Sequence, residues 1–146
     1  MRADRAFLDT NLFVYLYSDT NTDKRGQVIQ AMNRYECFIS TQVLNEFCNV
    51  CIRKLKLPTP SVKKAVEEIR NACNLIMVDD TTVLAALDLH ARYGYHYYDC
   101  LVLASALEGK CRCLLSEDMA DGQVIDRTLT IRNIFRPPLP KGEAPD

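Results

Sequence analysis

The segment RAFLDTN, residues 5–11, decides the fold of this chain of 146 residues. Its first four residues predict a buried strand, and the strand ends directly at a carboxylate, Asp9. Asn11 follows as an N-cap for a short apolar helix over residues 12–17. This passage from strand through acid to helix favours an α/β protein, because ligands bind at the carboxyl ends of strands in open α/β sheets.

Strands and helices alternate along the rest of the chain. Strands are predicted over residues 5–8, 36–39, 75–78, 113–115 and 130–134. Helices are predicted over residues 12–17, 23–34, 41–54, 62–72, 80–93 and 97–108. We therefore expect an α/β sandwich with a mostly parallel sheet and right-handed crossovers.

The helix ends carry recognisable signals. Ser40 or Thr41 is expected to start the third helix, and Thr59 or Ser61 to cap the fourth, after the break at residues 57–61. Gly94 is expected to end the fifth helix.

The composition, with 48% hydrophobic and 25% charged residues, is that of an ordinary soluble globular protein. No apolar run approaches the roughly 18 residues of a membrane span. Residues 1–5 lack the apolar stretch of a signal peptide. We expect one cytoplasmic domain over residues 1–135 and a Pro-rich, flexible tail over residues 136–146.

The seven cysteines do not indicate a zinc site or a disulfide framework. Most lie inside apolar segments, which is typical of small buried hydrophobic residues. Cys48 and Cys51 have CxxC spacing but fall within a predicted helix, and Cys111 and Cys113 lead into a predicted strand. Structural zinc needs about four convergent ligands, usually from loops.

The net charge of −1 hides an asymmetry. Residues 21–70 hold nine basic and five acidic side chains, whereas residues 71–126 hold three basic and nine acidic ones. A basic surface beside an acidic pocket suits a phosphodiester polymer. Arg53, Lys54 and Lys56 are candidate RNA-binding residues, although cations at a helix C-terminus have an equal structural explanation.

Four acids stand beside apolar runs, where an isolated carboxylate costs several kcal/mol, in order of magnitude, unless it is paired or binds a metal. They are Asp9, Glu46, Asp99 and Asp118. Carboxylates that converge repel one another, and a hard divalent cation resolves that repulsion. The pattern predicts a site for Mg²⁺ or Mn²⁺.

Each acid also has a purely structural explanation. Asp9 and Asp118 fit caps or turns after strands, and Asp99 fits an N-cap for an apolar helix. Glu46 borders the apolar face of its helix and fits a rim residue that snorkels to solvent or pairs with a lysine. The combination of four acids on alternating elements favours the metal site.

Together these motifs resemble the PIN-domain nucleases. The resemblance rests on FLDTN at 7–11, Glu46, Gly94 ahead of YYDCLVLASA at 97–106, and LLSEDM at 114–119. It covers about residues 5–135, and within that family the chain resembles the bacterial toxins of VapBC-type toxin–antitoxin pairs. The resemblance implies a five-stranded parallel sheet between helices, a small antitoxin partner and a homodimer.

The same resemblance implies a metal-dependent endoribonuclease in which a metal-activated water displaces the ribose 3′-oxygen. Asp9, Glu46 and Asp99 would be its three near-invariant acids, and Asp118 its more variable fourth, with Asp121 as a substitute. The family's supporting residues would be Thr10, Asn11 and Ser116.

Two other functions remain open from the sequence. An aspartate-dependent phosphatase typically needs a second acid two residues after its nucleophile, a position that Asn11 occupies here. A catalytically idle RNA-binding module would have no need for the four acids. A third interpretation is an α/β domain whose acids serve only as caps.

Overall fold

The computed structural model describes residues 3–137. Its strands are β1 (Arg5–Leu8), β2 (Glu36–Ser40), β3 (Asn74–Ile76), β4 (Cys113–Leu115), β5 (Val124–Ile125) and β6 (Leu129–Arg132). Its helices are α1 (Thr10–Tyr17), α2 (Thr22–Arg34), α3 (Thr41–Arg53), α4 (Thr59–Ala72), α5 (Asp80–Tyr93) and α6 (Tyr97–Glu108). The predicted α/β architecture is confirmed, and the part of the predicted tail from residue 138 onward lies outside the described residues.

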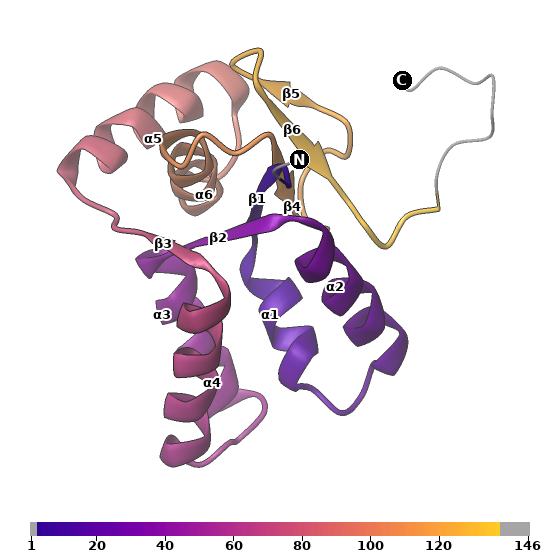
Figure 1. Ribbon diagram of the computed structural model, residues 1–146. Coiled ribbons are helices and arrows are strands. Elements are labelled where there is room, and N and C mark those ends of the chain that lie inside the picture. Colours follow the sequence, from indigo (N-terminus) through magenta and orange to yellow (C-terminus); the bar gives the residue numbers. More distant parts are fainter. Residues whose placement is uncertain (1–2, 138–146) are drawn as a thin grey trace.

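The strands form one sheet in the order β3-β2-β1-β4-β6-β5. All neighbouring strands are parallel except β5, which is antiparallel to β6. The chain therefore moves from β1 to β2 to β3 in one direction and then returns to place β4 on the other side of β1. Because crossovers are right-handed, this reversal puts α1–α4 on one side of the sheet and α5 and α6 on the other, as Figure 1 shows.

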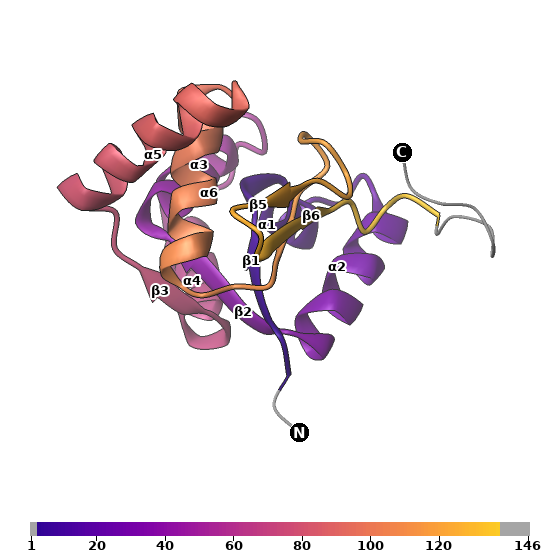
Figure 2. The same cartoon turned by 90° about the horizontal axis from the view of Figure 1, so that it is seen from above.

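Figure 2, seen from above, looks through these layers: α5 and α6 overlap α3 and α4, and α2 lies on the other side of the central strands. The core lies between these layers and the sheet. Phe7, Leu8 and Leu114 of the central strands have no exposed surface. Helix α6 is buried on nearly all sides from Cys100 to Ala106, as a helix without a polar stripe must be.

The sheet has six strands, so the expectation of five was wrong. The additional strand, β5, is only two residues long and pairs with β6 through a tight turn. Asp126 and Arg127 form that turn with positive φ angles of 48° and 66°. The sequence did not indicate a hairpin there because the turn lacks the glycine that usually occupies such positions.

Two helix starts also differ from the prediction. Asp9, rather than Asn11, is the N-cap of α1, because this helix begins directly after β1. Pro58, rather than Thr59 or Ser61, is the N-cap of α4 and supplies no side-chain hydrogen bond. Pro60 fits the first turn, where no intrahelical N–H bond is needed.

Other helix ends follow the sequence. Ser40 caps α3 through a hydrogen bond from the Val43 N–H, and Gly94 ends α5 in the left-handed conformation. Among residues 3–137, no helix combines the length and apolar character needed to span a bilayer.

Candidate active site

The site lies where the strand order reverses. In open α/β sheets the segments that leave two adjacent strands in opposite directions open a crevice at their carboxyl ends. Here those strands are β1, which is followed by Asp9, and β4, which is followed by Ser116. The Ser116 hydroxyl donates a hydrogen bond of 2.9 Å to Asp9 Oδ2, so a direct contact joins the two strand ends.

Asp9 is the most buried of the four acids, with 9% of its surface exposed. Its Oδ1 accepts a 2.8 Å hydrogen bond from the Thr10 N–H. Burial raises the pKa of Asp9 to about 6, hydrogen bonds from Thr10 and Ser116 oppose the shift, and the charges of Asp99 and Glu46 add to it. Asp9 is therefore a carboxylate whose negative charge lacks a cationic partner in this pocket.

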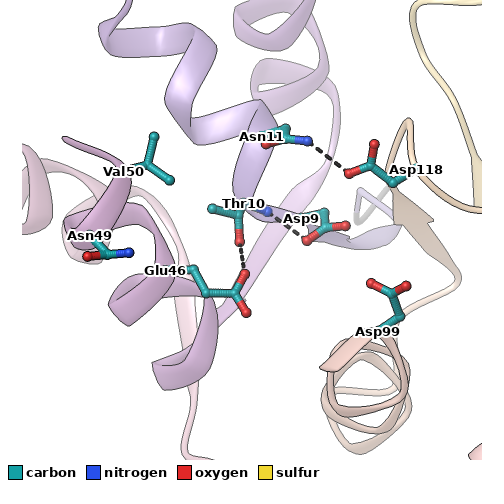
Figure 3. A pocket seen from close by; sticks show the side chains of 8 residues that line it. All are labelled: Asp9, Thr10, Asn11, Glu46, Asn49, Val50, Asp99 and Asp118. Carbon is teal, nitrogen blue, oxygen red and sulfur yellow. Dashed lines mark hydrogen bonds between the residues drawn. The ribbon is translucent and has the colours of Figure 1, made fainter. Parts of the chain in front are cut away.

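Glu46 of α3 is held by two neutral donors. The Thr10 hydroxyl donates to Oε2 and the Gln42 amide donates to Oε1, each at 2.7 Å. The alternative in which Glu46 pairs with a lysine does not match these contacts. Thr10 thus links α1 to α3 beside Asp9, as Figure 3 shows.

Asp99 lies in the first turn of α6. Its interpretation as a plain N-cap is wrong, since His96 is the N-cap and makes no side-chain capping bond. Burial raises the pKa of Asp99, with the charges of Asp118 and Glu46 acting in the same direction and His96 opposing them. Because α6 lies on the other side of the sheet from α1 and α3, Asp99 approaches the cavity from the side opposite to Thr10 and Glu46.

Asp118 and Asp121 lie differently. Asp118 lines the cavity, and its Oδ2 accepts a 2.9 Å hydrogen bond from the Asn11 amide. Asp121 accepts a bond from the Asn133 N–H and lies 3.9 Å from the Arg136 guanidinium, away from the cavity lining. Of the two candidates for the fourth acid, only Asp118 stands with the other three.

The four acids face one cavity of about 290 Å³. Figure 3 shows it with its lining: Asp9, Thr10, Asn11, Glu46, Asn49, Val50, Asp99 and Asp118. These residues come from the end of β1, from α1, α3 and α6, and from the turn after β4. Carboxylate oxygens are the donors that hard divalent cations prefer, so the chemistry of the lining fits such an ion.

The acids are not closed around a common point. Within residues 3–137, no three side chains of His, Cys, Asp or Glu are grouped closely enough to hold a metal ion. Hydrogen bonds orient two of the carboxylates: Thr10 and Gln42 donate to Glu46, and Asn11 donates to Asp118. A bound cation would have to replace some of these neutral donors.

Two residues of the site were missed from the sequence. Gln42 lies one helical turn before Glu46, a spacing at which side chains on a helix meet. Asn49 lines the cavity one turn after Glu46. Helical spacing places both residues beside Glu46. An amide side chain by itself does not indicate a metal site, so neither residue was predicted.

The candidate RNA-binding residues lie outside the cavity lining. Arg53 ends α3, and Lys54 and Lys56 follow it; all three are exposed. Glu46, Asn49 and Arg53 occur at helical spacing along α3, so this helix leads from the cavity toward the basic segment.

The family model of the PIN domain matches residues 6–120. The chain belongs to the PIN domain family. The matched residues include all four acids, Asp9, Glu46, Asp99 and Asp118. Comparison with curated proteins found no matching sequence.

Solved structures of toxins and toxin–antitoxin complexes share this fold. A toxin–antitoxin complex from Klebsiella pneumoniae has a TM-score of 0.67 and 17% identity, covering 89% of this chain and 98% of that chain. VapC20 of Mycobacterium tuberculosis, described as a toxin that cleaves the sarcin–ricin loop, has a TM-score of 0.63 and 15% identity, with coverage of 77% and 91%. DNA-bound VapBC from Salmonella typhimurium has a TM-score of 0.63 and 16% identity, covering 92% of this chain and 99% of that chain. At these identities the likeness concerns the fold.

Proposed function

We propose that this PIN domain is a metal-dependent endoribonuclease and the toxin of a toxin–antitoxin pair. One observation carries the proposal: four carboxylates from separate elements line a single cavity, and one of them is buried. Such an arrangement is unfavourable for the empty protein and becomes favourable when a divalent cation neutralises it.

Asp9, Glu46, Asp99 and Asp118 are the proposed ligands of Mg²⁺ or Mn²⁺. When bound, such an ion lowers the pKa of a water and polarises a phosphate oxygen. Ser116 and the Thr10 N–H orient Asp9, Thr10 and Gln42 orient Glu46, and Asn11 holds Asp118. Ser116, Thr10 and Gln42 would keep Asp9 and Glu46 in place while the substrate is bound, whereas the Asn11 amide would release Asp118 to the cation.

RNA is the proposed substrate, and Arg53, Lys54 and Lys56 are the proposed contacts to its phosphates. Their exposure and their place at the end of α3 support this role. Lysine and arginine side chains that neutralise phosphates supply most of the sequence-independent affinity for nucleic acid.

The proposed partners are a small antitoxin and a second copy of the chain. The structural neighbours include toxin–antitoxin complexes, some of them bound to DNA. A protein that covers the cavity would keep a free nuclease from damaging its host, which supports an inhibitory partner.

Cleavage of a labelled RNA mixture tests the activity. We expect the purified protein to cleave RNA with Mn²⁺ or Mg²⁺, to lose cleavage in EDTA, and to lose it in Asp99→Asn without unfolding. Asp121→Asn is the matched control, because Asp121 lies outside the cavity lining.

Cleavage by Asp99→Asn at the wild-type rate would contradict the nuclease proposal. RNA binding without cleavage under any of these conditions, after removal of a co-purifying partner, would favour the idle binding module. A phospho-aspartate trapped at Asp9 would favour the phosphatase.

A further inference from the structure

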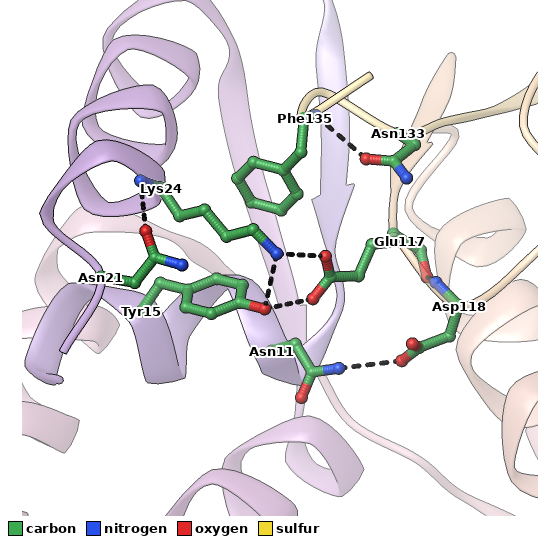
Figure 4. A network of polar contacts seen from close by, with 9 residues as sticks. Asn11, Tyr15, Asn21, Lys24, Glu117, Asp118, Asn133 and Phe135 are labelled. Atoms are coloured by element: carbon green, nitrogen blue, oxygen red, sulfur yellow. Dashed lines mark hydrogen bonds and ion pairs between the residues drawn. The ribbon is translucent and has the colours of Figure 1, made fainter.

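A second polar cluster adjoins the turn that carries Asp118. It consists of Tyr15 of α1, Lys24 of α2, Glu117 and Phe135, and we name it the Lys24 cluster (Figure 4). Tyr15 and Lys24 lie on consecutive helices, whereas Glu117 and Phe135 come from the far end of the chain; Lys24 and Glu117 are separated by 93 positions. None of them lines the cavity.

Three hydrogen bonds close the cluster. Lys24 Nζ donates to Glu117 Oε2 at 2.9 Å and to the Tyr15 hydroxyl oxygen at 3.1 Å. The Tyr15 hydroxyl donates in turn to the other carboxylate oxygen of Glu117. Each of the three side chains thus contacts the other two.

Aromatic rings enclose the ammonium group. Lys24 Nζ lies 4.8 Å from the ring centres of both Tyr15 and Phe135, within the range of a cation–π contact. The two rings meet edge to face, with centres 5.4 Å apart. Phe135, from the segment after β6, therefore packs against an ion pair that stays partly exposed, with 30% of the Lys24 side chain and 18% of the Glu117 side chain accessible to solvent.

Lys24 and Glu117 remain charged at neutral pH. The hydrogen bond to Glu117 raises the pKa of Lys24. Partial burial acts to raise the pKa of Glu117, but the bonds from Tyr15 and Lys24 outweigh it and leave that pKa below its usual range. The negative charge of Glu117 is therefore balanced locally, in contrast to the acids of the cavity.

The cluster holds the turn that follows β4. Glu117 stands between Ser116, which donates to Asp9, and Asp118, which accepts from Asn11. Tyr15 lies four residues after Asn11, on the same face of α1. Helix α1 therefore contacts this turn at two points one helical turn apart, Asn11 to Asp118 and Tyr15 to Glu117.

We propose that Glu117 is a positioning residue that, through Lys24 and Tyr15, keeps Asp118 beside Asp9 and so sets the affinity of the cavity for a divalent cation. The inference rests on the proposed function. When Asp118 exchanges the Asn11 amide for a cation, the hydrogen bond between Tyr15 and Glu117 remains in place. The turn then stays fixed while its carboxylate is free to bind.

Mn²⁺ titration of the purified protein by calorimetry tests the inference without reference to cleavage. We expect Glu117→Gln and Lys24→Met to raise the Mn²⁺ dissociation constant about tenfold or more, as loss of residues that orient metal ligands does. Lys24→Arg keeps the charge and the contact with the rings, so it should stay close to the wild-type value.

Asp126→Asn is the matched control. Asp126 also accepts hydrogen bonds from a cation and a tyrosine, Arg92 at 2.6 and 3.1 Å and Tyr93 at 3.0 Å, and it lies outside the cavity lining. Asparagine tolerates its positive φ of 48°. We expect this variant to lower the melting temperature and to leave the Mn²⁺ dissociation constant unchanged.

The outcomes separate the two proposals. Failure of the wild-type protein to bind Mn²⁺ would overturn the proposed function itself. Wild-type binding with an unchanged dissociation constant in Glu117→Gln would overturn only the positioning role. An equal loss of Mn²⁺ affinity in Asp126→Asn would also overturn the positioning role, because the loss would then result from lower overall stability of the protein.

Discussion

At the scale of single residues, the chain places negative charge where the fold opposes it. Asp9 has two neutral donors and no cationic partner, and its neighbours in the cavity are other acids. In contrast, Glu117, one position from Asp118, accepts hydrogen bonds from a lysine and a tyrosine. The difference in partners distinguishes the acids that are available to a cation from the acid that stabilises the turn.

The raised pKa of Asp9 predicts how metal-free stability depends on pH. The folded pKa is about 6 against an ordinary value of 3.8, so the folded state binds the proton more tightly. The free energy of unfolding should therefore fall as pH rises from about 4 to about 6, by up to about 3 kcal/mol from this group. Urea unfolding in EDTA across this range measures the effect.

Asp9→Asn removes the charge and keeps an oxygen for the Thr10 N–H. We expect this variant to be more stable than the wild type by about 1–3 kcal/mol at pH 7.5 in EDTA, and to lose that advantage at pH 4. If the two proteins showed the same pH dependence between 4 and 6, the account of Asp9 would be wrong.

At the scale of elements, most boundaries follow from local signals. β1 and α6 begin and end at the predicted residues because apolar runs and clear breaks define them. β5 was missed because two residues give no periodicity. Glu46 and Asp99 were found as acids beside apolar faces, whereas the contact between Lys24 and Glu117 depends on the packing of α2 against the turn after β4, which no local pattern encodes.

Gly94 tests the end of α5, the helix that precedes the Asp99 segment. Its φ of +75° is left-handed, and a Cβ there would meet no atom within 4 Å. We therefore expect Gly94→Ala to cost about 1–2 kcal/mol through backbone strain alone, and Gly94→Asn to cost less. Urea unfolding of both variants measures the difference. Equal losses of unfolding free energy in the two variants would contradict backbone strain as the cause.

At the scale of the whole molecule, the order of the strands brings the site residues together. Because β4 returns to the far side of β1, acids from both faces of the sheet meet at one crevice. The acids were predicted from the sequence, but their meeting in one cavity follows from this reversal. Helix α3 then connects the cavity to the exposed basic residues at its end.

The basic segment predicts the salt dependence of RNA binding. With cleavage blocked by Asp99→Asn, replacing Arg53, Lys54 and Lys56 by alanine should weaken binding to many sequences alike. The slope of log affinity against log salt should fall by about 0.7 for each phosphate contact that the substitutions remove. Filter binding at several salt concentrations measures it.

Lys110→Ala with Arg112→Ala is the control, since both residues are exposed and lie just before the amino-terminal end of β4, whereas the cavity lies at the carboxyl-terminal ends of β1 and β4. An equal change of slope in this control would argue against a specific RNA path along α3.

The most direct test of the central claim is the position of a bound ion. Crystals grown with Mn²⁺ should give an anomalous-scattering peak inside the cavity, in contact with the carboxylates of Asp9 and Asp99, and no such peak in Asp99→Asn. A peak elsewhere, or an empty cavity in wild-type crystals at a Mn²⁺ concentration that supports cleavage, would contradict the claim that these acids form a metal centre.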